Sequence, residues 1–318
     1  MPTYLSQSST YRIKTYKPTK HSTVMLSRLF IFASIGLVSA LAPQQRGTEL
    51  IPKQIAIVRR RSGLTHKEYV NYHALIHGLK SWNGPRDNSF PAAYIQDHTF
   101  DSAFGVNDSV PNQIYVGRDD VTELYGNSST SFTSPPATNY TAEVTGPDGY
   151  NFNDLATAFS MLAYEKPVLG SIDRSETVTD KIGSGPVVAF FWAAAKPQIS
   201  SNDTFGVDLA NQIVKLIPKD TLYRATVHIP LPGSDTRPYF GGDTMPTMNA
   251  VVKLWLHRKS NAVDLVRAAQ LKLDSDALSL NQDLSFIVFC NEVVLWDFAK
   301  KVNFDEKRIQ TQVNKEFY

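Results

Sequence analysis

The order of strand-like and helix-like segments predicts an α+β fold built from two ferredoxin-like β-α-β-β-α-β repeats. Two observations support this prediction. The same order of apolar strand patterns and amphipathic helix patterns occurs in each half of the chain. The 318 residues, 42% of them hydrophobic, are enough to give both repeats a substantial core. Two such sheets in one polypeptide are expected to pack face to face and close a pseudo-symmetric α+β barrel.

The first repeat is predicted over residues 50–185, and it opens with a strand at 54–59 (QIAIVR). Thr65 and Glu68 follow with the spacing of a capping box, so a helix is expected to begin there. Its apolar positions recur at helical spacing, which predicts a buried stripe made of Tyr69, Tyr72, Ile76 and Leu79.

The rest of the first repeat is less regular. Short strands are predicted at 92–100 and 113–117. Residues 118–152 are rich in Ser, Thr, Pro and Gly, a composition typical of a long surface insertion. Helical spacing returns at 153–165, and the last strand of this repeat has only a weak pattern.

The second repeat is predicted over residues 186–300 and has clearer patterns, followed by a C-terminal tail at 301–318. Its expected elements are a strand at 186–195, a helix at 207–217, strands at 221–231 and 249–257, a helix at 262–273 and a strand at 284–290.

The N-terminal segment has the pattern of a targeting sequence. No acidic residue precedes Glu49, and a basic lead is followed by an apolar run at 29–42. This pattern predicts a signal peptide over residues 1–42 and a secreted, extracellular protein, because the run is short for a bilayer span. A transit peptide or a retained membrane anchor is the alternative, and either Met1 or Met25 could be the start.

Secretion agrees with four N-glycosylation sequons, at Asn107, Asn127, Asn139 and Asn202. The single cysteine, Cys290, excludes an internal disulfide and is expected to be a buried, inert thiol. A net charge of +2 gives no reason to expect nucleic acid as a partner, and no stable membrane span is expected in the mature chain.

Two histidines four residues apart, His73 and His77, lie on the capped helix. Such a pair can bind a metal ion, but Ala74 stands where a zinc protease has its glutamate, and no carboxylate follows at close spacing. A metal site is therefore disfavoured. The sequence also has no phosphate-binding glycine motif and no nucleophile elbow, which argues against nucleotide enzymes and serine hydrolases.

The stretch RRRSGLTHKEYVNYHALIHG resembles the opening of the EthD family. The matching positions are Arg59, Arg60, Gly63, Leu64, Thr65, Tyr69, Tyr72 and His77. YIQDHTF, with Tyr94 and His98, and DDVTELY, with Asp119 or Asp120 and Glu123, are similar to later family segments. The resemblance covers residues 54–165, and it implies a dimeric α+β barrel without a bound cofactor. It also implies dehydration or oxidation of aromatic, polyketide-like molecules.

On this resemblance, His77 and His98 are the expected acid–base pair, because imidazole titrates near neutral pH. Tyr94 would supply a hydroxyl, and Asp120 would orient an imidazole. The alternative is structural: His77 would hydrogen-bond a carbonyl near the helix end, and His98 would be a half-buried strand residue. Between the two helix histidines, we expect His77 rather than His73 to be functional.

Three functions follow from these observations. The first is a cofactor-independent dehydratase or oxidoreductase acting on a hydrophobic aromatic molecule. The second is a secreted, non-catalytic protein that binds a small molecule. The third is a haem-handling barrel protein, for which His228 and His257 are available. The protein is expected to be a monomer or a homodimer.

Overall fold

The strands of both repeats join in one closed antiparallel barrel. The computed structural model describes residues 52–106, 116–133, 138–170, 186–197, 203–257 and 261–317. Its strands are β1 (Pro52–Val58), β2 (Ala93–Phe104), β3 (Asp120–Tyr125), β4 (Phe159–Leu169), β5 (Val187–Ala195), β6 (Leu222–Pro230), β7 (Ala250–Leu256) and β8 (Leu280–Asp297). They pair in the order β1-β3-β2-β8-β5-β7-β6-β4.

This order contains two ferredoxin-like sheets. The first repeat contributes β4-β1-β3-β2 and the second β8-β5-β7-β6. Pairing of β2 with β8 and of β4 with β6 joins the two sheets at both edges. The predicted fold class is therefore confirmed: two repeats close a dimeric α+β barrel arrangement within one polypeptide.

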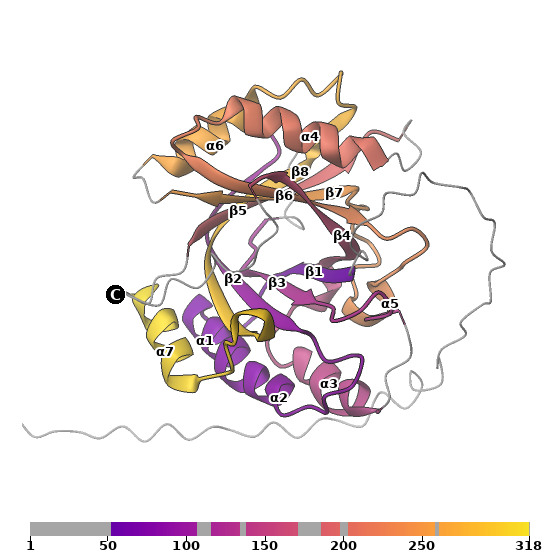
Figure 1. Ribbon diagram of the computed structural model, residues 1–318, viewed down its shortest axis with the longest axis vertical. Coiled ribbons are helices and arrows are strands. Elements are labelled where there is room, and N and C mark those ends of the chain that lie inside the picture. The colour runs from indigo at the N-terminus through magenta and orange to yellow at the C-terminus, as the bar shows by residue number, and fades with distance from the viewer. Residues whose placement is uncertain are drawn as a thin grey trace, which may run out of the picture. The chain divides into compact units, whose positions relative to one another are not determined.

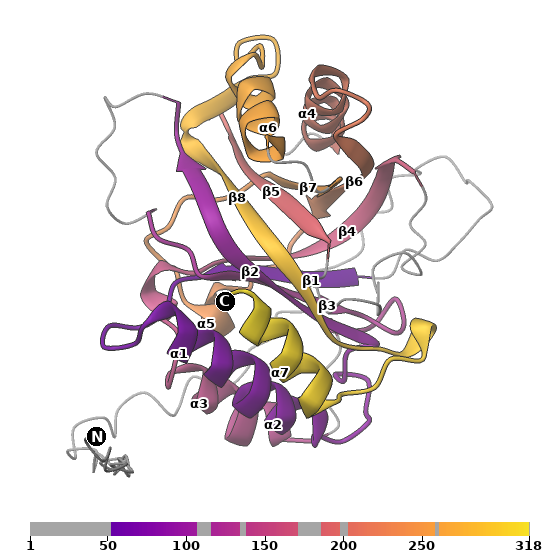
Figure 2. The ribbon, with the colours of Figure 1, turned by 90° about the vertical axis from the view of Figure 1, so that its left-hand side faces the viewer.

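Helices cover the outer faces of the barrel in two groups (Figures 1 and 2). Over the second repeat lie α4 (Asp203–Leu216) and α6 (Ala262–Leu271). Over the first lie α1 (His66–Asn71), the π-helical turn η1 (Tyr72–His77), α2 (Gly78–Trp82), the π turn η2 (Thr141–Thr145), α3 (Gly146–Gly149) and α7 (Glu306–Lys315). Three further short helical segments lie in the described residues: η3 (Leu155–Thr157), α5 (Arg237–Phe240) and η5 (Phe298–Lys300). No helix in these ranges has the length and hydropathy needed to cross a bilayer.

Two expectations about the first repeat and one about the C-terminal tail were wrong. The predicted insertion at 118–152 contains a barrel strand, β3, and the helical turns η2 and α3. The predicted helix at 153–165 is instead mostly β4, whose pairing with both β1 and β6 overrides the local preference of its Ala, Met and Leu residues for helix. In the predicted tail at 301–318, α7 packs against β8 and against the α1–η1 helix.

The first helix also buries a different stripe from the predicted one. The capping box of Thr65 and Glu68 is present as expected. Ile76 and Leu79, however, are 46% and 38% exposed, whereas His73 and Ala74 are buried. The reason is the π turn, in which the Gly78 amide bonds to the carbonyl of His73, five residues back, and so rotates the later residues around the helix axis.

The barrel interior has an apolar end and a charged end. At the apolar end, Ile57 of β1 lies in register with Phe159 and packs in the same cluster as Trp192. At the charged end, Lys53 of β1 and Lys253 of β7 are completely buried. Buried charges are stable only when paired, so this end must contain carboxylates as well.

Candidate active site

His73 lies between the helices and the outer face of the first sheet. Its side chain is 3% exposed. Nε2 is 2.9 Å from the hydroxyl of Tyr94 on β2, and Nδ1 is 2.6 Å from Oδ2 of Asp120 on the neighbouring β3. The Asp120 contact lies outside the angular range of a hydrogen bond, so it is a close polar contact without a hydrogen bond. A carboxylate, an imidazole and a phenol are thus aligned in one buried row.

The side-chain amide of Gln96 determines the direction in which the hydrogen bonds of this row run. The side-chain amide of Gln96 donates to the Tyr94 hydroxyl at 2.9 Å and to the His73 carbonyl at 3.2 Å. With its oxygen accepting from Gln96, the phenol can direct its own proton at Nε2 of His73. Nδ1 of His73 is then the nitrogen next to the Asp120 carboxylate, so the three groups follow the order of a catalytic triad, with a close contact in place of the Nδ1–carboxylate hydrogen bond.

Tyr69 connects this row to the surface. Its hydroxyl donates to Asp120 Oδ1 at 2.9 Å and lies 3.3 Å from the side-chain oxygen of Asn153. Burial, and next the negative charge of Asp120, raise the pKa of Tyr69 well above its usual value. Tyr69 therefore stays protonated and acts as a fixed donor to the carboxylate.

His77 does not face His98, which corrects the predicted pairing. Nδ1 of His77 is 2.9 Å from Oδ2 of Asp148, next to which α3 ends. Burial lowers the pKa of His77, although the Asp148 hydrogen bond opposes this effect. His77 is therefore a neutral imidazole at pH 7, and it reaches the same cluster as His73, with ring centroids 5.5 Å apart.

His98 instead pairs with the C-terminal helix. Its Nδ1 lies 2.9 Å from both carboxylate oxygens of Glu316, the residue at which α7 ends. Burial lowers the pKa of His98, but the Glu316 carboxylate outweighs it, so the net shift is upward. His98 thus anchors α7 to the sheet, a structural position. Of the four predicted site residues, the structure brings Tyr94 and Asp120 into contact with His73, a histidine that was not selected.

An aromatic cage surrounds one ring next to His73. Phe152 is 1% exposed, and its ring centroid lies 4.7 Å from that of His73 and 5.0 Å from that of His77. The rings of Tyr69 and Tyr72 lie 5.7 and 5.4 Å away. The site therefore already accommodates a flat aromatic group.

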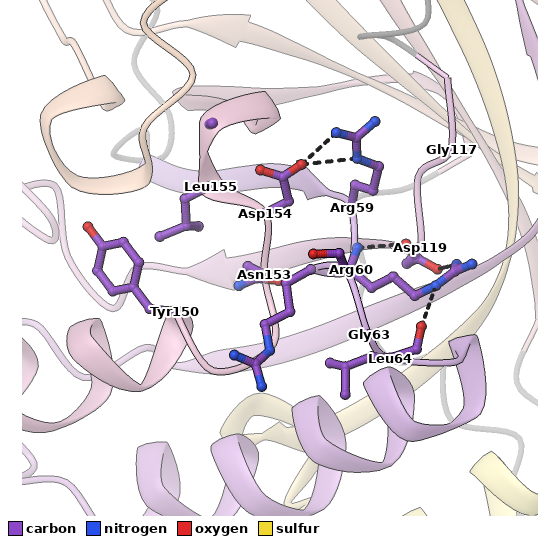
Figure 3. Close-up of a pocket in the computed structure, with 13 residues that line it drawn as sticks. Arg59, Arg60, Gly63, Leu64, Gly117, Asp119, Tyr150, Asn153, Asp154 and Leu155 are labelled. Carbon is purple, nitrogen blue, oxygen red and sulfur yellow. Dashed lines mark hydrogen bonds and ion pairs between the residues drawn. The ribbon is translucent and has the colours of Figure 1, made fainter. Parts of the chain in front are cut away.

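A surface pocket of about 840 Å³ adjoins this cage (Figure 3). The residues on either side of Phe152, among them Tyr150 and Asn153, line the pocket. Phe152 points inward instead, toward His73. The ring of Phe152 and its turn thus lie between the pocket and the buried row.

The charged end of the barrel contains a second cluster, which sequence patterns did not identify. Nζ of Lys253 donates to Glu123 at 2.5 Å and to Glu292 at 2.6 Å and lies 3.7 Å from Asp97. The three carboxylates offer oxygens within 4.8 Å of one another, as a metal site would. The Lys253 ammonium already contacts all three carboxylates, Lys53 also pairs with Glu123, and burial raises the pKa of Asp97, so the cluster fits a metal poorly. The available signal was a lone charged residue in an otherwise mostly apolar strand, Lys53 in β1 and Lys253 in β7.

His228 and His257 do not fit the role of an axial haem ligand. His228 is buried in the barrel, with Nε2 2.7 Å from Lys53 and Nδ1 3.0 Å from the Val251 carbonyl. Burial and the Lys53 charge lower the pKa of His228 to about 4, so both nitrogens of a neutral ring are engaged. His257 is exposed.

The other predicted positions divide by location. Asn127 and Asn139 are exposed, whereas Asn107, Asn202 and the leader at 1–42 lie outside the described residues. Cys290 is buried as expected, and burial raises the pKa of its thiol.

No protein-family model matches the sequence, and no curated protein matches it. Among solved structures, the chain is similar to an anthrone oxidase-like protein, with 10% identity and a TM-score of 0.45 over 77% of this chain and 92% of that chain. It is also similar to a chlorite dismutase mutant from Candidatus Nitrospira defluvii in complex with cyanide, with 9% identity and a TM-score of 0.40 over 84% of this chain and 96% of that one. Likenesses this distant carry no information on chemistry.

Proposed function

We propose that the protein is an enzyme that acts on a small molecule and removes a proton from a hydrophobic aromatic substrate. The observation that carries the proposal is the buried row of Asp120, His73 and Tyr94. A histidine held between a carboxylate and a hydroxyl is an arrangement suited to general acid–base catalysis. The resemblance of residues 54–165 to the EthD family supports the same class of reaction.

In this proposal, His73 is the base. It takes the phenolic proton of Tyr94 as the Tyr94 oxygen takes one from the substrate, and the Asp120 carboxylate stabilises the imidazolium that forms. His77, neutral and close by, is a second group able to accept a proton. Proton removal is the first step of both a cofactor-independent oxidation and an aromatising dehydration, so either reaction can follow.

The cage supports an aromatic substrate. His73 and Tyr94 are almost completely buried, so a substrate must displace something to reach them. Phe152 is the group to displace, because its ring fills the cage and its neighbours in the chain line the surface pocket. A substrate ring taking its place would lie against the rings of Tyr69 and Tyr72.

The test is a turnover assay on a panel of phenols, anthrones and hydroxylated polyketides, monitored by mass spectrometry. We expect His73→Gln to abolish turnover, because a neutral amide cannot accept the proton. Asp120→Asn should lower the rate roughly 10⁴-fold, as loss of the triad carboxylate does elsewhere. His98→Gln, which removes an imidazole from the same sheet face, is the matched control and should keep most of the activity. Equal activity of the His73 and His98 variants would contradict the proposal.

A secreted protein that binds a small molecule without chemistry is the second candidate. It is favoured by the closure of the site, in which His73 is 3% and Tyr94 2% exposed. A wild-type protein that binds aromatic probes but turns none of them over, with unchanged affinity in His73→Gln, would establish this alternative.

A further inference from the structure

Three consecutive arginines, Arg59, Arg60 and Arg61, line the surface pocket. Tyr150 and Asp154 line it as well, with Asp154 next to Arg59 (Figure 3). The pocket volume of about 840 Å³ is within the range of small-molecule sites. What the pocket can bind depends on which of these charges are already paired.

Two of the arginines are neutralised within the protein. Arg59 contacts a single oxygen of Asp154 through Nη2 at 2.5 Å and Nε at 3.2 Å. Arg60 forms an ion pair with Asp119, and its backbone amide donates to the same carboxylate at 2.7 Å. The guanidinium of Arg61 is exposed and has no hydrogen bond or ion pair with any part of the chain that the structure describes. Among the described residues, one positive charge on the pocket wall is therefore left without a counter-ion.

The rest of the pocket surface is partly apolar. Leu64 and Leu155 line it, and so does the ring of Tyr150, which is 68% exposed. An exposed aromatic ring beside an unpaired guanidinium suits a ligand with a flat apolar body and an anionic group. A guanidinium binds a carboxylate through two parallel hydrogen bonds, which a single surface charge on lysine cannot reproduce.

We propose that this pocket binds aromatic carboxylates, with Arg61 holding the carboxylate. The inference rests on the proposed function in one respect: the ring of such a ligand would face the turn that carries Phe152, and so the entrance to the cage. It assigns a substrate class, an aromatic acid, to a site proposed above for aromatic molecules in general.

The test measures binding alone, by calorimetry with benzoate and with its neutral analogue benzamide. Wild-type protein should bind benzoate more tightly than benzamide, and added salt should weaken benzoate binding alone. Arg61→Gln should weaken benzoate binding about tenfold, the effect of losing one charged hydrogen-bonding pair, and leave benzamide unchanged. Lys272→Gln, which removes an exposed charge from the second repeat, is the matched control and should change neither affinity.

Asp154→Asn gives a test in the opposite direction. It removes the negative charge that neutralises Arg59, so the pocket gains a second uncompensated cation and benzoate should bind more tightly than in wild type. Equal affinity of wild type for benzoate and benzamide, an equal loss of both in Arg61→Gln, or weaker benzoate binding in Asp154→Asn would each overturn the proposal. None of these measurements involves turnover. If the protein showed no preference for benzoate, the proposed proton transfer by His73 would be unaffected. If it bound benzoate but turned over no substrate, only the proposed catalytic function would be refuted.

Discussion

Removing the ring of Phe152 tests whether the aromatic cage is a ligand site. The side chain is 1% exposed and packs between two imidazoles and two phenols. Truncation of a buried phenylalanine to alanine costs about 3–5 kcal/mol. For a domain of this size, that corresponds to a fall in melting temperature of roughly 6–20 °C. Phe152→Ala should therefore fold, with lower stability, and contain a cavity next to His73.

The cavity should prefer a phenol to a plain hydrocarbon. The rings of His73 and His77 lie against Phe152, and an imidazole can hydrogen-bond a phenol hydroxyl but not a hydrocarbon. In thermal unfolding, phenol at a hundredfold excess over its dissociation constant should restore about 2.7 kcal/mol, and toluene at the same concentration less. The phenol-dependent gain should fall in the double variant with Tyr94→Phe, which lacks the hydroxyl.

Phe191→Ala is the matched control. Phe191 is also 1% exposed, but it belongs to a cluster of aliphatic and phenylalanine side chains under α4 and α6. Its cavity should cost a similar amount of stability and should bind toluene at least as well as phenol. If Phe152→Ala shows the same preference as Phe191→Ala, the cage is ordinary core packing and the proposed route to His73 is wrong.

Three further predictions concern the charge clusters and the leader. Lys253→Met should lower the free energy of unfolding at pH 7 by about 3–5 kcal/mol, because it leaves buried carboxylates unpaired. In urea titrations, the difference in free energy of unfolding between variant and wild type should shrink as the pH falls, because these carboxylates become protonated. Glu316→Gln should lower the free energy of unfolding by about 1.5–3 kcal/mol near pH 6 and by progressively less as the pH rises. The reason is that Glu316 holds the folded-state pKa of His98 above its unfolded value, so the stabilisation by this pair is lost once the imidazole deprotonates. A difference in melting temperature between variant and wild type that is equal at pH 6 and pH 9 would contradict this. We also propose secretion, so expression in a eukaryotic host should give protein in the medium that becomes smaller on deglycosylation, with Asn127 and Asn139 among the modified sites; an intact, unglycosylated cytosolic chain would rule it out.

Local patterns in the sequence were enough to predict much of the fold. Strands β5 to β8 and helices α4 and α6 lie where the patterns placed them, because each has an apolar face of regular period. β4 was mistaken for a helix because it pairs on both edges and its residues favour helix when considered alone. Long-range strand pairing is not visible in a window of a dozen residues.

The candidate site was predicted in its composition more than in its geometry. Tyr94 and Asp120 were expected beside an imidazole, and both contact one. His77 was chosen over His73 because the expected stripe assumed a regular α-helix through Ile76 and Leu79. The π turn at 72–77 rotates those later residues outward, and His73 is buried instead. Lys253 and its carboxylates are separated by up to 156 residues in the chain, so no local pattern could identify them as partners.

The union of two repeats in one polypeptide has a consequence for the divergence of the two halves. In a barrel assembled from two identical chains, every substitution appears twice, so a cavity on one side requires the same cavity on the other. Here the layer under α4 and α6 is filled with aliphatic and phenylalanine side chains, while the layer under α1 holds the polar and aromatic cage. One half can thus act as a rigid support, while the other half contains polar groups in place of close apolar packing, as the proposed active site requires. Because strand pairing between the halves is intramolecular, the barrel should also remain closed on dilution, at any expression level.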